Sequence, residues 1–180
     1  MQIYRDIVLP YLQRRLVNIH FEVETRAEWG SDRPHFREQL SQATGRFAEF
    51  SISHARGLGG FAAIGTESWS MVPLGFDIEE SVRLRPDLVA RIAVKLDDAR
   101  PAGLNMSFIW SAKEASFKAL HGDDQPSVIT GISLRQWHEL EKGVWEFHFY
   151  AGESLYSSGF GVVWSEPPYQ FSLCFRTRHS

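Results

Sequence analysis

The last third of the chain is the part of the sequence that most constrains the fold. Four successive segments are rich in β-branched and aromatic residues, and glycines or a proline pair stand between them: residues 128–137, 144–150, 155–164 and 169–176. Segments of this composition and length are typical of β-strands. Gly143, Gly152 and Pro167-Pro168 are placed at the turns between them. We therefore expect a run of consecutive strands in this region.

A helix is predicted immediately before these strands, over residues 107–120. Ser107 could cap its N-terminus and Gly122 could end it. The apolar residues that recur at the helical period are Phe108, Ala112, Ala115 and Ala119. On the polar side, Glu114 precedes Lys118 by four residues, which is the order that favours an ion pair on a solvated helix face.

The earlier part of the chain repeats this order of a helix followed by strands. A helix is predicted over residues 3–16, where Pro10 should kink it, and Ile19, Phe21 and Val23 then alternate with polar residues as in a strand. Further expected elements are a short helix between Pro34 and Gly45, strands over residues 50–53, 61–65 and 73–79, and a helix from Pro86 to residue 100. The pattern indicates an α+β fold with two topologically similar halves.

The composition limits the classes of function. A chain of 180 residues with 43% hydrophobic and 13% aromatic residues can bury a real core, and a net charge of −3 gives no general attraction for nucleic acid. Cys174 is the only cysteine, which excludes an intrachain disulfide or a cysteine-based zinc site. The longest small or apolar run, residues 57–65, is too short to cross a membrane. We expect a soluble, cytoplasmic protein that binds neither nucleic acid nor membrane.

Two acidic side chains share one face of the strand at residues 73–79. Asp77 and Glu79 point one way and Phe76 and Ile78 the other. Together with Glu114 they offer three hard oxygen ligands, which suit Mg²⁺ or Mn²⁺. The alternative is that Glu114 pairs only with Lys118 and that the strand acids face solvent.

A histidine lies where a serine-containing strand enters a glycine-rich turn. Phe50 and Ile52 alternate with Ser51 and Ser53, and His54 then leads into the turn. Backbone amides and an imidazole at such a place can hold a phosphate, although a single histidine is also common as a structural residue. The glycines match neither the P-loop nor the dinucleotide fingerprint, so they are interpreted as turn formers.

Three segments in order resemble the motifs of the 4′-phosphopantetheinyl transferases. They are Ser51-Ile-Ser-His54, Gly75-Phe-Asp-Ile-Glu79 and Trp110-Ser-Ala-Lys-Glu-Ala-Ser-Phe-Lys118. Their order and spacing are similar to the surfactin-synthetase-activating type. Upstream, Arg5 and Arg14 have the spacing of two arginines in a helix of the family, and Arg33-Pro34 looks like its Gly-Lys/Arg-Pro element, for which Gly45-Arg46 is a rival match. The chain begins inside what resembles the first helix of the family, so the N-terminal half looks shortened.

The resemblance implies a fold, an activity and a set of site residues. The fold would be a pseudo-dimer of two helix-plus-antiparallel-sheet halves, residues 1–70 and 71–180, with a ligand cleft between them. The activity would be Mg²⁺-dependent transfer of the phosphopantetheine arm of coenzyme A to a serine of an acyl or peptidyl carrier protein, releasing adenosine 3′,5′-bisphosphate. The metal ligands would be Asp77, Glu79 and Glu114, and the catalytic residues Glu114, Lys118 and His54. The coenzyme A contacts would be Arg5, Arg33, Ser53, His54, Lys113 and Lys118, with Lys118 at the pyrophosphate and Arg46 as the alternative to Arg33.

Several alternatives remain open at the level of sequence. The general base could be Glu114 or a metal-bound water. A non-catalytic module that binds coenzyme A or a carrier, and a Mg²⁺-dependent phosphohydrolase, would use the same residues. The basic residues within 83–100 are predicted to help dock an acidic carrier. We expect a monomer or a weak homo-oligomer.

Overall fold

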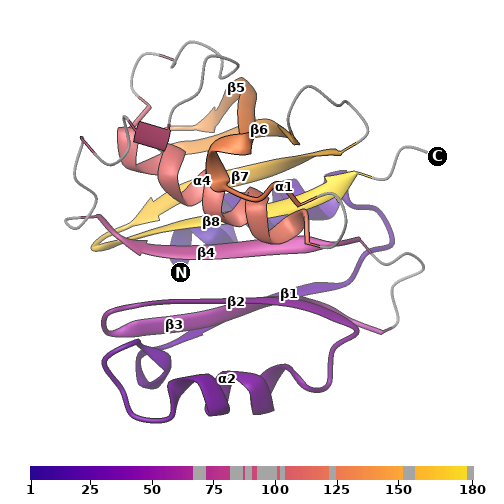
Figure 1. The fold of residues 1–180 in the computed structure, drawn as a ribbon. Helices are drawn as coiled ribbons and strands as arrows, with labels where there is room; N and C mark the ends of the chain where they lie inside the picture. The colour runs from indigo at the N-terminus through magenta and orange to yellow at the C-terminus, as the bar shows by residue number, and fades with distance from the viewer. Residues whose placement is uncertain are drawn as a thin grey trace.

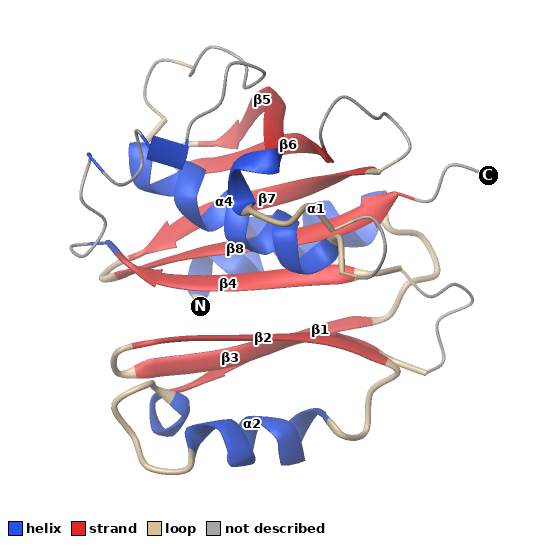
Figure 2. Cartoon of the chain, viewed as in Figure 1, coloured by secondary structure: helices blue, strands red, loops and turns tan. Residues whose placement is uncertain are grey.

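The computed structural model describes residues 1–66, 72–81, 87, 91–92, 101, 104–121, 125–151 and 157–177. Within them the chain forms two antiparallel β-sheets and three α-helices, which confirms the prediction of an α+β fold. Figures 1 and 2 show the smaller sheet below the larger one, with α2 beneath the smaller sheet, α4 in front of the larger sheet and α1 behind it.

The smaller sheet belongs to the first part of the chain. Its strand order is β1 (Phe21–Arg26), β3 (Leu58–Ile64) and β2 (Glu49–Ala55). A 3₁₀ turn, η2 (Ala27–Trp29), and helix α2 (Phe36–Thr44) follow β1 and precede β2. Trp29, Leu40, Phe61 and Ala63 form the core between α2 and the sheet. The predicted helix between Pro34 and Gly45 is thereby confirmed.

The larger sheet contains the four predicted C-terminal strands and the acidic strand. Its order is β4 (Leu74–Glu80), β8 (Tyr169–Thr177), β7 (Ser158–Glu166), β6 (Val144–Ala151) and β5 (Ile132–Glu141). The expected strand at residues 128–137 starts later than predicted, because the 3₁₀ turn η4 (Ile129–Gly131) precedes β5. The first two residues of the expected strand at 155–164 lie outside the described residues.

Helix α4 (Met106–Ala119) covers one face of the larger sheet. Its predicted apolar stripe is buried against Phe147, Phe149 and Cys174. The prediction that Ser107 caps this helix is wrong: Asn105 is the cap, since its side chain accepts a hydrogen bond from the Ser107 amide at 3.1 Å. Gly122 lies outside the described residues.

The N-terminal helix packs between the two sheets, on the side opposite α4. It starts as a π-helical turn, η1 (Tyr4–Val8), and continues as α1 (Leu9–Arg15). Pro10 lies in the first turn of α1, directly after this π-helical turn. The buried residues of this helix share one core with both sheets, and Tyr4 stacks on Trp164 with ring centroids 5.8 Å apart. Each sheet thus lies within one of the predicted halves, while the first helix contacts both.

The two sheets meet along an edge, where β2 lies beside β4. Serine hydroxyls replace a backbone ladder there: the Phe76 amide donates to Ser51 Oγ at 2.9 Å and the Ile78 amide to Ser53 Oγ at 3.0 Å. Ser51 pairs with Phe76 and Ser53 with Ile78, so the residue numbers increase in the same direction along both strands. The two strands therefore run parallel. We call this edge the seam.

A close contact fixes α4 above the seam. A Cβ atom on Gly75 of β4 would lie 1.9 Å from the carbonyl oxygen of Ala115 and 2.6 Å from the Ala119 amide nitrogen. Only glycine allows the backbone of the helix to come this near to the strand. The contact sets the height at which Glu114 and Lys118 face β4.

No helix in the described parts of the chain is long and apolar enough to span a membrane. Most of the predicted helix at residues 86–100, with its basic residues, lies outside the described residues; Asp87, Arg91 and Ile92 are helical.

Candidate active site at the seam

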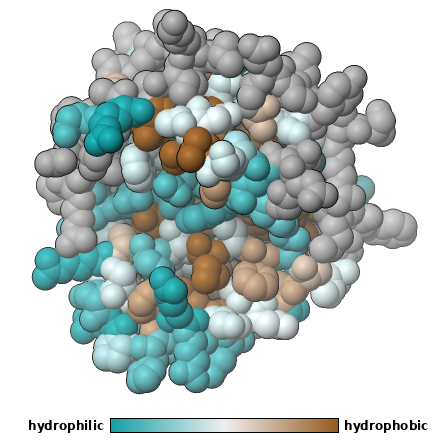
Figure 3. Space-filling model, viewed as in Figure 1, coloured by the Kyte–Doolittle hydropathy of each residue, from teal (hydrophilic) through white to brown (hydrophobic). Residues whose placement is uncertain are grey.

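A pocket of about 340 Å³ opens where β2, β4 and α4 meet. Six of the predicted site residues line it: Ser53, His54, Asp77, Glu79, Glu114 and Lys118. Ile52, Ile78 and Trp110 complete the lining. Figure 3 shows polar and apolar residues side by side in the middle of the corresponding face of the molecule. The pocket therefore gathers residues from all three of the sequence segments singled out above.

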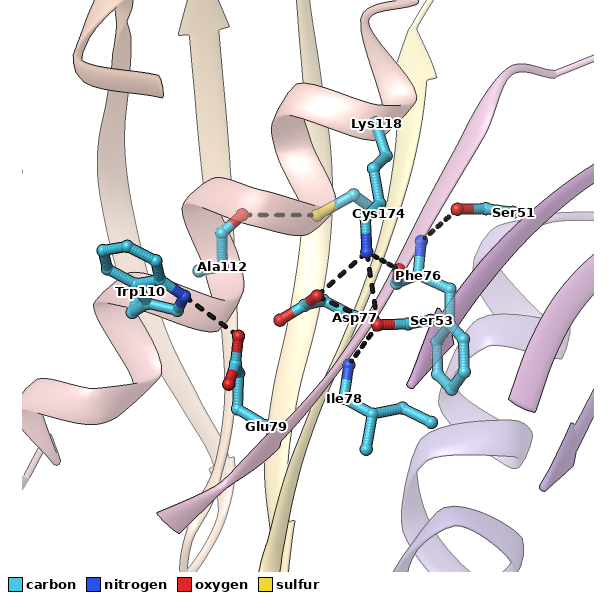
Figure 4. A network of polar contacts seen from close by, with 10 residues as sticks. All are labelled: Ser51, Ser53, Phe76, Asp77, Ile78, Glu79, Trp110, Ala112, Lys118 and Cys174. Carbon is cyan, nitrogen blue, oxygen red and sulfur yellow. Dashed lines mark hydrogen bonds and ion pairs between the residues drawn. The ribbon is translucent and has the colours of Figure 1, made fainter. Parts of the chain in front are cut away.

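A polar network ties the floor of the pocket together (Figure 4). Lys118 Nζ donates to Asp77 Oδ1 at 2.9 Å, to the Phe76 carbonyl oxygen at 2.9 Å and to Ser53 Oγ at 3.2 Å. Ser53 Oγ in turn donates to Asp77 Oδ1 at 3.1 Å. The ion pair of Lys118 is thus made with Asp77 on the neighbouring strand, and this lysine links α4 to both strands of the seam.

Asp77 is buried, with 4% of its surface exposed. Its Oδ1 accepts the bonds from Lys118 and Ser53, but Oδ2 is buried and has no hydrogen-bond partner among the described residues. A buried carboxylate oxygen without a partner is costly, and in native proteins it usually marks a missing water or ion. This oxygen belongs to a residue that lines the pocket.

The other two carboxylates carry raised pKa values. Burial, and then the charge of Asp77, raise the pKa of Glu79 to about 7, although Trp110 Nε1 donates to its Oε1 at 3.0 Å. Burial, and then the charge of Asp77, also raise the pKa of Glu114. The charge of Asp77 therefore disfavours the ionised forms of both glutamates, as expected for carboxylates that share a site without a cation.

A divalent cation fits this donor set. It would relieve the repulsion and give Asp77 Oδ2 a partner, and hard carboxylate oxygens suit Mg²⁺ or Mn²⁺. In the part of the chain that the structure describes, no three His, Cys, Asp or Glu side chains already stand together as a metal-binding group. The side chains of Glu79 and Glu114 would therefore have to close around the ion.

The raised pKa of Glu79 predicts an unusual dependence of stability on pH. The folded protein favours the protonated form of Glu79. The contribution of Glu79 to the free energy of unfolding is therefore complete below about pH 4.5 and is lost as pH rises through about 7. We expect metal-free Glu79→Gln to be more stable than the parent at pH 8 by on the order of 2 kcal/mol, with little difference at pH 4.5. Urea unfolding across this pH range measures it, with exposed Glu141→Gln as the control. Mg²⁺ should reduce the difference in stability between Glu79→Gln and the parent, because it stabilises the parent. Stability that varies with pH in the same way in both proteins would contradict the prediction.

His54 is half-buried at the edge of the pocket. Its ring meets Phe36 edge-on, with centroids 4.4 Å apart. Burial lowers the pKa of His54 below its ordinary value of 6.5; the charges of Arg37 and Lys118 act in the same direction, and a backbone hydrogen bond and the charge of Asp77 act against it. The imidazole is therefore neutral at pH 7 and can donate one hydrogen bond to an anion.

An anion bound beside His54 should reverse this shift, because a nearby negative charge favours the imidazolium form. We expect NMR titration of the free protein to give His54 a pKa below 6.5, and added coenzyme A to raise it by about one unit. Exposed His138, for which no such effect is expected, is the internal control. An unchanged His54 titration in the presence of saturating coenzyme A would contradict phosphate binding at this residue.

Four predicted ligand contacts lie elsewhere. Lys113 does not line the pocket: its side chain is fully buried and Nζ donates to the Ile132 carbonyl oxygen at 2.6 Å. Arg5 and Arg33 are exposed and do not line the pocket. Arg46 lines a second pocket of about 360 Å³, where its guanidinium lies 3.3 Å from a carboxylate oxygen of Glu22.

Two residues near the pocket were not predicted. Trp110 orients Glu79, and its position four residues before Glu114 was a signal that both share one face of α4. Arg37 lies beside the pocket, with its guanidinium 5.8 Å from the centre of the Phe36 ring that packs on His54. No periodicity or motif marked Arg37, because its nearness to His54 depends on how α2 packs on the small sheet.

Comparison with known proteins adds no family assignment. No protein-family model matches the sequence, and no curated protein matches it.

Proposed function

We propose that the protein is a Mg²⁺-dependent 4′-phosphopantetheinyl transferase that uses the pocket at the seam. One observation carries the proposal: residues of three segments, up to 65 positions apart in the sequence, line a single pocket with the residue types that the motif resemblance requires. Its volume of about 340 Å³ is at the lower end of small-molecule sites, which run from about 300 to 1,000 Å³. The proposal includes the pseudo-dimer relation of the two halves and coenzyme A as the ligand held between them.

The reaction moves the phosphopantetheine group from one oxygen to another. The hydroxyl oxygen of a carrier serine attacks the β-phosphorus of coenzyme A, the bond from that phosphorus to the bridging oxygen breaks, and adenosine 3′,5′-bisphosphate leaves with the electron pair. The serine proton goes to a base. A bound Mg²⁺ would supply neutralisation of the pyrophosphate charge.

The chain's own residues would provide the remaining functions. Asp77, Glu79 and Glu114 hold the negative charge that retains the cation at the pocket. The neutral His54 imidazole donates an N–H to a phosphate oxygen without itself needing to be charged. Glu114 lines the pocket and is the candidate to accept the serine proton, directly or through a water.

The test is incubation of the purified protein with coenzyme A, Mg²⁺ and a panel of apo carrier proteins, followed by mass spectrometry of the carriers. A phosphopantetheine adduct on the carrier serine is expected. Release of adenosine 3′,5′-bisphosphate without a carrier would instead indicate a phosphohydrolase. Coenzyme A binding that is independent of Mg²⁺ and gives no adduct would indicate a binding module.

A further inference from the structure

Lys118 uses all of its hydrogen-bond donors inside the protein. An ammonium group has three N–H bonds. Those of Lys118 are directed to Asp77 Oδ1, Ser53 Oγ and the Phe76 carbonyl oxygen, and 29% of the side chain remains exposed. While these bonds hold, Lys118 has no donor left for a phosphate oxygen.

The hydroxyl of Ser53 likewise has all of its hydrogen-bonding positions occupied. Its hydroxyl donates to Asp77 Oδ1 and accepts from the Ile78 amide and from Lys118 Nζ, which fills its one donor and two acceptor positions. Two side chains from different elements thus converge on the same oxygen of Asp77.

The second oxygen of Asp77 is left for the pocket. Figure 4 shows one carboxylate oxygen directed at Lys118 and Ser53 and the other pointing toward the side on which Glu79 lies. That second oxygen, Oδ2, is buried and without a hydrogen-bond partner among the described residues. Tilting the carboxylate plane would break both bonds to Oδ1, so the network fixes the position from which the second oxygen is presented.

We propose that Lys118 and Ser53 are positioning residues, which fix Oδ1 of Asp77 at the seam and leave Oδ2 as the single oxygen that this side chain offers to a divalent cation. The inference rests on the metal site of the proposed function and changes the roles that the motif resemblance implies for both residues. Lys118 acts on the cation through Asp77, and the positive charge that meets the phosphates comes from the cation. Groups that orient a metal ligand typically change metal affinity by about 10- to 100-fold when removed.

Two serines of β2 provide a matched pair of variants for the test. Ser51→Ala and Ser53→Ala each remove a buried hydroxyl that accepts an amide of β4, but only Ser53 also contacts Asp77. Mn²⁺ affinity, measured by electron paramagnetic resonance without coenzyme A or carrier, should fall about tenfold in Ser53→Ala and stay within about twofold of the parent in Ser51→Ala. Equal effects of the two variants, or no effect of Ser53→Ala, would overturn the proposal.

Lys118→Met gives a test of opposite sign. If Lys118 were only a nearby charge, its removal would relieve repulsion and tighten Mn²⁺ binding. If it positions Asp77, its removal should weaken Mn²⁺ binding by about tenfold or more. Unchanged or tighter binding would refute the positioning role, and the serine pair decides the question if Lys118→Met does not fold.

The readout separates this inference from the proposed function. Mn²⁺ binding requires neither coenzyme A nor a carrier, so a parent protein that binds Mn²⁺ with these variant effects but transfers nothing would retain the positioning roles and lose the transferase. If the parent protein binds no Mn²⁺, the positioning roles proposed for Lys118 and Ser53 are refuted directly.

Discussion

Replacing Glu114 by glutamine should lower the rate of phosphopantetheine transfer by about a thousandfold while the protein stays folded. The substitution keeps the shape of the side chain but removes a negative charge from the pocket, and with it one of three acidic groups available to a cation. It also removes the candidate base. Initial rates of carrier modification at fixed coenzyme A and Mg²⁺ measure the effect.

The expected stability of this variant distinguishes a site residue from a structural one. Glu114 makes none of the hydrogen bonds that hold the seam, and its raised pKa shows that the ionised form is disfavoured by the fold. Metal-free Glu114→Gln should therefore unfold at the same urea concentration as the parent or higher. Glu141→Gln, on an exposed part of β5, should retain the parental rate. A Glu114→Gln rate within tenfold of the parent would remove this residue from the proposed mechanism.

The alternation of β4 was predictable because a strand has a fixed period of two. Phe76 and Ile78 are buried in the core shared with the N-terminal helix, and Asp77 and Glu79 line the pocket on the other face. Once the helix at residues 106–119 was expected, its apolar stripe predicted which face would meet the sheet. These features follow from local geometry.

The alternation of β2 was also visible in the sequence. In β2, however, the polar residues face the interior, which is the reverse of a strand with one solvent-exposed polar face. Phe50 is 44% exposed, whereas Ser51 and Ser53 are 8% and 6% exposed. The serines are buried because they accept the amides of a neighbouring strand at the seam. Nothing within residues 50–53 specifies that neighbour, since β4 lies about 25 residues further along the chain.

The contacts of the two lysines on α4 could be predicted from the sequence to different degrees. Lys118 pairs with Asp77 because α4 lies close to β4, a distance that the sequence does not encode in any local pattern. The position of Lys113 away from the pocket agrees with helical geometry, which puts residues five apart on different faces. Its hydrogen bond to the Ile132 carbonyl depends on how α4 packs on the larger sheet.

The glycine at the contact between β4 and α4 should be highly sensitive to substitution. Gly75→Ala places a Cβ atom 1.9 Å from the Ala115 carbonyl oxygen, and neither backbone can give way without moving the helix by more than an ångström. Overpacking of a core typically costs about 1–3 kcal/mol, and a clash between two backbones belongs at or above the upper end of this range. We therefore expect Gly75→Ala to lower the free energy of unfolding by at least about 3 kcal/mol.

The same displacement should affect the pocket. Glu114 and Lys118 follow α4, and a helix lifted from β4 would lengthen the contacts of Lys118 with Asp77 and with the Phe76 carbonyl. Transfer and Mn²⁺ binding should therefore both decline in Gly75→Ala, even at temperatures where the variant is still folded. Urea unfolding and Mn²⁺ titration at 10 °C measure the two effects separately.

Gly45→Ala is the matched control for this prediction. Gly45 follows α2 with a helical φ of −60°, and a Cβ atom there would make only ordinary contacts, the nearest at 3.7 Å. This variant should be as stable as the parent or slightly more so, because alanine restricts the unfolded chain. If Gly75→Ala lost less than 1 kcal/mol and bound Mn²⁺ like the parent, then the height of α4 above β4 would not determine the geometry of the site, and the role given to Lys118 at the seam would have to be abandoned with it.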